Sequence, residues 1–231
     1  MVLAKPTSRC TQMILLKVPV QHNLREKTQG TGAIWWKALA VLQKSPGFVR
    51  VYFGRRVEIP DSVHLHVVRE TLEQSQDFLK SPLYQEFKSA IDQLTNVEPT
   101  IRHAFIGEYS PGCESLAKGA PVTGTAIYVD LQDLWDERWD QWTGIVPKVE
   151  GFMGIAGGPL VESVAGFKDC YIALVGWKNV EVHDTYHHTA DFASKSHILL
   201  DPGRSKKKFT EYGHIAFESD LVVEADSASK L

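Results

Sequence analysis

The stretch from residue 63 to residue 87 reads VHLHVVRETLEQSQDFLKSPLYQEF, and its two periodicities indicate the fold. Every second residue from Val63 to Val67 is apolar, which predicts a strand that buries one face. Residues 72–94 have helical spacing, and we expect a break at Ser81-Pro82 because proline suits a first helical turn. The stretch therefore predicts a strand followed by a broken helix.

A second copy of this pattern lies further along the chain. When the sequence is slid along itself, Arg69-Glu-Thr-Leu-Glu73 aligns with Trp177-Lys-Asn-Val-Glu181. Slightly different shifts align further pairs, namely Trp35 with Trp139, Gly47-Phe48 with Gly151-Phe152, and His103-Ala-Phe105 with His214-Ile-Ala-Phe217. Because chain order is kept while the shift drifts only slightly, we infer a duplicated domain. We expect unit 1 over residues 12–110 and unit 2 over residues 122–219, with a Pro- and Gly-rich linker at 111–121.

Both units have the order strand, helix, strand, strand, helix, strand. The expected strands are 13–20, 48–53, 63–69 and 101–108 in unit 1, and 122–130, 151–156, 169–176 and 211–218 in unit 2. The expected helices are 31–44, 72–94, 132–147 and 179–197. This order predicts a ferredoxin-like α+β unit with both helices on one face of the sheet. Two such units in one chain can pack sheet to sheet as an intrachain pseudo-dimeric α+β barrel, with a ligand cavity between the sheets.

Composition excludes several classes of protein. The 231 residues are 43% hydrophobic and 23% charged, which is typical of a globular protein, and the net charge of −3 gives no general attraction to nucleic acid or anionic membrane. No apolar run is long enough to span a bilayer, so we expect a cytoplasmic protein without membrane or nucleic-acid partners. The three cysteines, Cys10, Cys113 and Cys170, lack the spacing of a zinc site and are expected to be reduced thiols.

Three segments resemble a known superfamily. These are Val57-Glu58-Ile59-Pro60, the run from Val63 to Phe78, and Ser81-Pro82-Leu83-Tyr84-Gln85-Glu86-Phe87. They resemble the dimeric α+β barrel superfamily in a tandem form, specifically antibiotic-biosynthesis-monooxygenase domains and stress-responsive barrel proteins. The resemblance implies one of several activities: cofactor-free oxygenation or cyclisation of polyketides, lactone isomerisation, haem degradation, or ligand binding without catalysis.

One mechanism within that superfamily does not transfer to this chain. Plant polyketide-cyclase relatives carry an acid–base pair in a tyrosine followed by H-P-x-H. Here Phe78 precedes Ser81-Pro82-Leu83-Tyr84 in unit 1, and Tyr186 precedes Thr189-Ala190-Asp191-Phe192 in unit 2. Neither copy keeps the histidine, so any catalysis needs other groups.

Strand alternation indicates which side chains face the space between the sheets. If Val63, Leu65 and Val67 pack on the helices, His64 and His66 face the other unit. The equivalent residues of that unit, Ile172 and Leu174, form an apolar wall. The predicted catalytic residues are His64, His66, His103, Tyr52 and Arg50. The predicted substrate-binding residues are Phe48, Phe105, Ile172, Leu174, Tyr212 and His214.

The ordinary histidine pKa near 6.5 suits proton transfer at neutral pH. We expect His64 or His66 to act as the base, the other histidine or His103 to orient it, and Tyr52 and Arg50 to stabilise an oxyanion. The leading hypothesis is a cofactor-independent enzyme that cyclises, isomerises or eliminates from a polyketide-like or aromatic natural product. The alternatives are a cofactor-free monooxygenase of an anthrone-like substrate and a ligand-binding or stress-response barrel without chemistry.

Four questions stay open from the sequence. The buried histidines could simply bond to backbone or water, a histidine could ligate haem, and the chain could pair again as a homodimer. His183, His187 and Asp191 stand at i, i+4 and i+8 of the last expected helix, which suits either a metal-binding face or a solvated face. We expect the solvated face and no metal site.

Overall fold

The computed structural model describes residues 9–108, 120–131, 133–200 and 209–222. These residues form a nine-stranded sheet in the order β4-β1-β3-β2-β9-β6-β8-β7-β5. The strands are β1 (Cys10–Lys17), β2 (Phe48–Arg56), β3 (Ser62–Arg69), β4 (Thr100–Ala104), β5 (Gly107–Glu108), β6 (Val122–Val129), β7 (Phe152–Pro159), β8 (Cys170–Trp177) and β9 (Phe209–Val222). All the paired strands are antiparallel.

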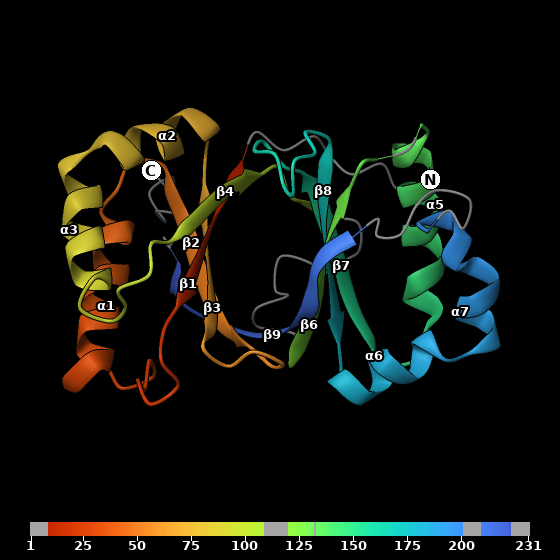
Figure 1. The fold of residues 1–231 in the computed structure, drawn as a ribbon, viewed down its shortest axis with the longest axis horizontal. Coiled ribbons are helices and arrows are strands. Elements are labelled where there is room, and N and C mark those ends of the chain that lie inside the picture. Colours follow the sequence, from red (N-terminus) through yellow and green to blue (C-terminus); the bar gives the residue numbers. More distant parts are fainter. Residues whose placement is uncertain (1–8, 109–119, 132, 201–208, 223–231) are drawn as a thin grey trace, which may run out of the picture.

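Helices cover the outer faces of the sheet, and the two halves of the sheet face each other across the middle of the molecule (Figure 1). Helices α1 (Gly30–Gln43), α2 (Leu72–Lys80) and α3 (Pro82–Ile91) lie on unit 1, and α5 (Trp135–Ile145), α6 (Val180–His187) and α7 (Ala190–Lys195) lie on unit 2. Short 3-10 turns follow α5 at Val146–Lys148 and α7 at Ser196–Ile198. The predicted pair of ferredoxin-like units packed as an α+β barrel is confirmed.

The last strand of each unit closes the barrel. In unit 1 the chain leaves β4 and bridges to the edge of unit 2, where Ala104 pairs with Leu160 before β5 pairs with β7. In unit 2, β9 pairs with β6 through its first half and with β2 through its second half. The strand predicted over 101–108 is therefore divided, with β4 in the sheet of unit 1 and β5 in that of unit 2, and β9 pairs with strands of both units. Backbone hydrogen bonds as well as side chains join the two units.

The two units cap their helices at equivalent positions, as given by the sequence alignment that matches Arg69 with Trp177. The side chain of Thr71 accepts a hydrogen bond at the start of α2, and that of Asn179 does so at the start of α6. Ser81 and Thr189 cap α3 and α7 in the same way. The helix predicted over 72–94 is indeed broken at Ser81-Pro82, and unit 2 breaks its helix at the equivalent place.

The predicted face is wrong for the first two residues of β2 and for β4. A β-bulge between Phe48 and Arg50 shifts the register of β2, so Phe48 packs in the helix-side core of unit 1 while Val49 turns toward the barrel interior. On β4, Ile101 packs on the helix side and Arg102 faces the barrel interior. His103 therefore lies on the helix side, opposite to the prediction.

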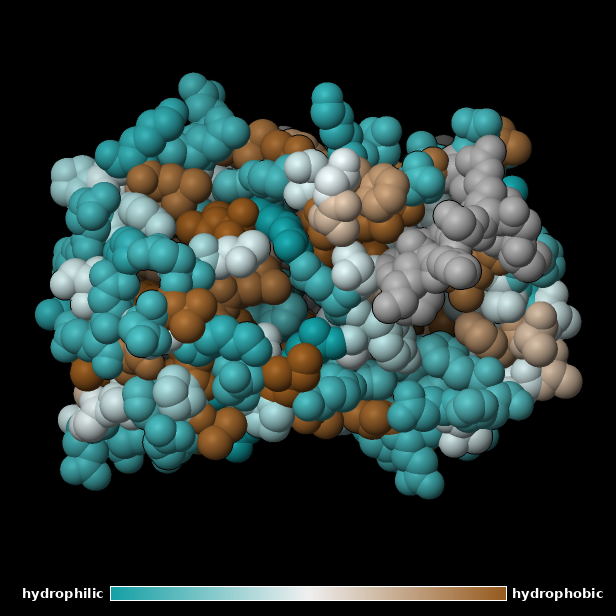
Figure 2. All heavy atoms as spheres, viewed as in Figure 1, coloured by the Kyte–Doolittle hydropathy of each residue, from teal (hydrophilic) through white to brown (hydrophobic). Residues whose placement is uncertain are grey.

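The surface mixes hydrophilic and hydrophobic side chains in the view of Figure 2. No helix in the described ranges has the length and apolar character needed to cross a membrane. The predicted linker at 111–121 lies almost wholly outside the described residues, and the unit boundaries stay predictions.

Candidate functional site

The predicted catalytic histidines lie inside the barrel, but they are tightly packed. His66 is 1% exposed, and its ring lies 5.3 Å from that of Tyr52 and 5.0 Å from that of Phe217. Neither ring nitrogen of His66 has a hydrogen-bond partner within the described ranges. Burial, and then the neighbouring His64, hold the pKa of His66 well below its ordinary value. His66 is a neutral core side chain in this arrangement.

The space beside His64 is too small for an organic substrate. His64, Arg102 and Glu211 border a cavity of about 10 Å³, together with Ile172 and other apolar side chains. Such a volume suits about one water molecule. The apolar wall predicted from Ile172 and Leu174 is present, yet it packs against the opposite sheet rather than leaving a pocket at this point. The described cavity that borders His64 is therefore far smaller than a substrate, and the catalytic roles of His64 and His66 stay predictions.

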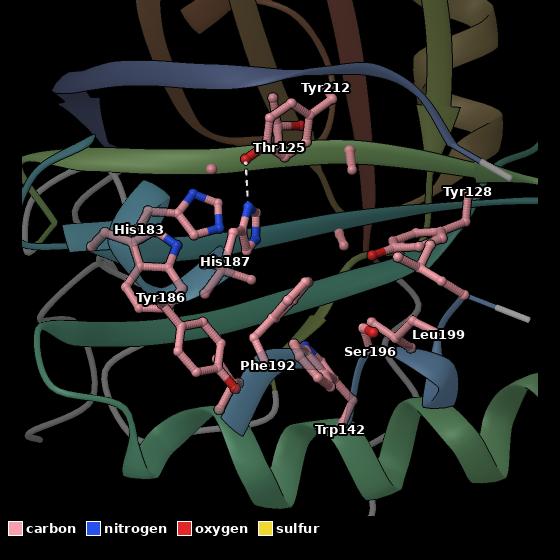
Figure 3. A pocket seen from close by; sticks show the side chains of 17 residues that line it. Thr125, Tyr128, Trp142, His183, Tyr186, His187, Phe192, Ser196, Leu199 and Tyr212 are labelled. Carbon is pink, nitrogen blue, oxygen red and sulfur yellow. Dashed lines mark hydrogen bonds between the residues drawn. The ribbon is translucent and has the colours of Figure 1, made fainter. Parts of the chain in front are cut away.

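A larger pocket lies on the helix side of unit 2, between the sheet and helices α5, α6 and α7 (Figure 3). Its volume is about 280 Å³, close to the roughly 300 Å³ at which small-molecule sites begin. Aromatic side chains form a large part of its walls, alongside small and aliphatic residues; they are Tyr128, Trp142, Trp177, Tyr186, Phe192 and Tyr212. Two histidines, His183 and His187, stand at one end, and Trp142, Ser196 and Leu199 stand at the other.

Small residues on the sheet explain why unit 2 has this pocket. The strand pairing makes Gly124, Ala126 and Ala173 equivalent to Gln12, Ile14 and Leu65 of unit 1. In unit 1 these three larger side chains are fully buried under the helices. Replacing them with glycine and alanine removes side-chain volume from one face of the unit 2 sheet, and the pocket occupies that volume.

A chain of three hydrogen-bonded groups leads into the pocket. Glu58, from the loop between β2 and β3 of unit 1, accepts hydrogen bonds from the backbone N–H of His214 at 3.0 Å and from its ring Nδ1 at 2.5 Å. The Nε2 of His214 lies 2.7 Å from Nδ1 of His183. With Nδ1 of His214 donating to the carboxylate, His214 Nε2 accepts from His183 Nδ1, and His183 Nε2 is left as an acceptor.

The electrostatics of this chain favour a neutral His183 and an ionised Glu58. Burial alone would raise the pKa of Glu58, but the backbone and ring hydrogen bonds from His214 outweigh it and hold that pKa below its ordinary value. Burial, followed by the neighbouring His187 and His214, lowers the pKa of His183 to about 3. The His183 ring also stacks on Trp177, with 4.6 Å between ring centres, which fixes its orientation.

Unit 1 contains the matching arrangement, but its third group lines none of the pockets described. Glu162 of unit 2 accepts from the backbone and ring Nδ1 of His103, both at 2.6 Å, and Nε2 of His103 lies 2.9 Å from Oγ of Ser75. Ser75 occupies the position equivalent to His183 and is fully buried. The glutamate–histidine pairs thus join the two units on both sides. Among the described residues, the third group lines a ligand-sized pocket in unit 2, where it is His183, but not in unit 1, where it is Ser75.

A second polar pair borders the same pocket. The hydroxyl of Tyr212 lies 3.4 Å from Nδ1 of His187. Burial, followed by the carboxylates of Asp184 and Glu58, raises the pKa of Tyr212 to about 12, so the hydroxyl keeps its proton and can donate it. Burial is also the main cause that lowers the pKa of His187. The pocket therefore offers both a proton acceptor and a hydrogen-bond donor.

His183, Asp184 and His214 are the group in the described ranges whose ligand atoms lie close enough to hold a metal ion, all within 4.8 Å of one another. The 2.7 Å between the two histidine nitrogens is a hydrogen-bond distance. Two nitrogens bound at about 2.0–2.1 Å to a tetrahedral zinc would stand about 3.4 Å apart, so the rings would have to separate to admit the ion. The present geometry suits proton transfer better than metal binding.

The sequence identified only part of this site. Tyr212 and His214 were predicted to bind substrate from the barrel interior, but they lie on the opposite face of the sheet, where Tyr212 lines the unit 2 pocket. The solvated helix face expected for His183 is wrong, because His183 is 7% exposed. Asp191 does not continue that face, since α6 ends at His187 and α7 begins after it. The sequence signal that could have identified His183 is that unit 2 has a histidine where the aligned position of unit 1 has Ser75.

The other predicted residues stay outside the pocket. Tyr52 and Arg50 lie on the barrel face of β2, with the Arg50 guanidinium 5.9 Å from the Tyr52 ring centre. Phe105 is half-buried in the segment that bridges the two units, where its backbone N–H donates to the carbonyl of Pro159. The chemical roles expected for these three residues stay predictions.

The sequence matches no protein-family model and no curated protein. Among solved structures, an anthrone oxidase-like protein superposes with a TM-score of 0.63 at 9% identity, over 96% of this chain and 99% of that one. A candidate monooxygenase from Lactobacillus acidophilus NCFM gives 0.56 at 8% identity, over 94% of this chain and 100% of that one. A candidate monooxygenase from Fusobacterium nucleatum subsp. nucleatum ATCC 25586 gives 0.54 at 9% identity, over 93% and 94%. The chain therefore shares the overall fold of these proteins, over nearly the whole length of both chains in each pair.

Proposed function

We propose that this chain is an enzyme that oxidises an anthrone-like aromatic ketone with molecular oxygen in the unit 2 pocket, without a cofactor. The observation that carries the proposal is the chain Glu58–His214–His183, which ends at an aromatic-walled pocket. The fold shared with an anthrone oxidase-like protein supports the substrate class. A flat tricyclic ketone matches walls made of aromatic rings.

The chain's own residues supply the acid–base steps. Nε2 of His183 takes a proton from the methylene carbon opposite the ring carbonyl, while Tyr212 donates a hydrogen bond to the oxygen that becomes an enolate. The carbanion is oxidised by O2 to a peroxide, which takes the proton back from His183. Loss of the second methylene proton and of hydroxide then forms the new carbonyl. One anthrone and one O2 give one quinone and one water.

The ionised Glu58 stabilises the positive charge that develops on the histidine pair during the first step. His183 can accept a proton at Nε2 while its Nδ1 proton is shared with His214. His214 is in turn held by the carboxylate, so the charge spreads along the chain toward Glu58. Because an opposite charge favours the protonated form of a histidine, this arrangement offsets part of the cost that burial imposes on the base.

A second candidate function uses the same base without oxygen. Cyclisation, isomerisation or elimination also begins with proton abstraction next to a carbonyl, and the Glu58–His214–His183 chain serves that step equally well. The two candidates differ only in the fate of the carbanion. Oxygen consumption therefore separates them.

The test is to follow O2 uptake and quinone formation from 1,8-dihydroxyanthrone in the presence of a metal chelator, with spontaneous oxidation subtracted. We expect one O2 per quinone, a loss of at least about 100-fold in His183→Ala, and unchanged turnover in His188→Ala. His188 is a matched control because it is the exposed histidine that directly follows α6. Product without O2 uptake would select the second candidate, and tight binding without any turnover would overturn both.

A further inference from the structure

Strand β9 carries a bulge at a place where one face of the sheet lines the unit 2 pocket and the other faces the barrel interior. Thr125 pairs with Gly213 and Ile127 pairs with Thr210, so Glu211 and Tyr212 together stand opposite the single residue between them on β6. Glu211 has φ of 54°, in the left-handed region that non-glycine residues rarely adopt. Such a conformation is strained and persists where surrounding contacts hold it.

Two arginines of unit 1 hold this bulge from the barrel side. Nη1 of Arg102, on β4, lies 2.6 Å from Oε1 of Glu211, and both side chains are largely buried. Arg56, on β2, donates from Nη2 to the backbone carbonyl of Tyr212. Gly213 leaves room for that contact, since an added Cβ there would clash with the Arg56 guanidinium. These contacts come from strands that belong to the other unit.

The side chain of Tyr212 emerges on the opposite face of the sheet, in the pocket. There its hydroxyl reaches His187, and its ring lies 6.2 Å from that of His183. The position of this hydroxyl thus depends on the backbone of the bulge, and the bulge is tied to Arg102 through Glu211.

We propose that Arg102 is a positioning residue: through its ion pair with Glu211 it holds the β9 bulge that directs the Tyr212 hydroxyl into the unit 2 pocket. The chemical part of this inference, donation by Tyr212 to the substrate oxygen, rests on the proposed function. The placement of Tyr212 does not, and it can be measured without turnover.

The experiment is a double-mutant cycle of Arg102→Met and Tyr212→Phe. We expect Tyr212→Phe to lower kcat by about 100-fold and Arg102→Met to lower it by roughly 10- to 100-fold, with smaller changes in KM. Because Arg102 acts through Tyr212, the double variant should be no slower than Tyr212→Phe alone. Additive losses would overturn the proposal.

A matched control lies on the same strand. Nη2 of Arg25 also stands 2.6 Å from a β9 carboxylate, that of Glu218, but this pair is exposed and lies well beyond the bulge. Arg25→Met should leave kcat unchanged, and an effect equal to that of Arg102→Met would overturn the proposal. Arg102→Lys, which keeps the charge, should recover part of the loss.

A binding readout separates failure of this inference from failure of the proposed function. The probe is 1,8-dihydroxyanthraquinone, and its affinity is read from quenching of Trp142 and Trp177, which line the pocket. If the wild type turns over no anthrone, the proposed function fails. The positioning role still stands if Arg102→Met and Tyr212→Phe weaken probe binding non-additively, and it falls if Arg102→Met leaves probe binding unchanged.

Discussion

Glu58 and His214 lie far apart in the sequence, yet the carboxylate of Glu58 accepts both the backbone N–H and the ring Nδ1–H of His214. Glu162 holds His103 in the same two-pronged way on the other side of the barrel. Each glutamate comes from one unit and each histidine from the other. Two equivalent glutamate–histidine pairs therefore join the duplicated halves, and in the described part of the chain the Glu58–His214 pair is the one that leads to a pocket.

Glu58→Gln should slow the reaction, because the neutral amide no longer stabilises positive charge on the histidine pair. We expect kcat to fall by about 10- to 100-fold, in line with other groups that orient a functional histidine, with little change in probe affinity. Steady-state kinetics with the anthrone substrate measure this.

Glu162→Gln is the matched control for that variant. It changes the equivalent pair in unit 1, where His103 meets the buried Ser75, so it should leave kcat unchanged. Its free energy of unfolding should fall by about 1–3 kcal/mol, the cost of weakening a charged hydrogen bond. Equal kinetic losses in the two variants would contradict a single active site in unit 2.

Gly124→Ala should disturb the base. An added Cβ would stand 2.8 Å from Cε1 of His183, which stacks on Trp177 and has little room to move. We expect a kcat loss of at least about 10-fold from displacement of the ring. Gly144→Ala in α5, where a Cβ meets nothing within 4 Å, should instead raise stability by about 0.5–1 kcal/mol and leave kcat unchanged.

Ala173→Leu should close the pocket by restoring the residue that fills unit 1. Leu65 occupies the equivalent position there and is fully buried. The added side chain takes volume from the ligand, so probe affinity should fall by more than about 10-fold, while thermal unfolding shows a folded protein. Unchanged probe affinity would place the ligand outside the unit 2 pocket.

Stability should fall as the solution becomes acidic, partly through His64. Burial, and then the charges of Arg56 and Arg102, lower the pKa of His64 to about 4 from an ordinary value of 6.5. Between these values the unfolded chain binds more protons than the folded one. Above pH 6.5 His64 therefore does not lower the free energy of unfolding, and as the pH falls from 6.5 toward 4 it lowers that free energy progressively.

From pH 7 to pH 5 this one group should remove about 2 kcal/mol of unfolding free energy. Urea unfolding of His64→Gln at both pH values should show a smaller difference than the wild type. His197→Gln, at an exposed position, should keep the wild-type difference. An identical pH dependence in His64→Gln would contradict the buried neutral histidine.

The sequence predicted the fold because its signals are local and repeated. Alternation in Val63–Val67, the proline after Ser81 and the aligned glycines at 47 and 151 act over short stretches, and the structure confirms the elements they predict. Both glycines have positive φ, of 69° and 82°, just before equivalent strands. The predictions of which side chains face the barrel interior failed where a strand departs from regular pairing. The bulge after Phe48 exchanged the faces of Phe48 and Val49 but left Tyr52 on the barrel face. On β4, Ile101 and His103 lie on the helix side rather than in the barrel interior.

The candidate site depended on differences between the copies rather than on their likeness. By itself the sequence determined two α+β units, their closure into one barrel and the apolar wall of Ile172 and Leu174, since periodic patterns fix which faces are buried. Tertiary structure alone decided where a ligand fits, because a pocket is the volume left between packed elements. Only the folded chain brings Glu58 of one unit to His214 of the other, and only there does the small Gly124 leave space that Gln12 fills in unit 1.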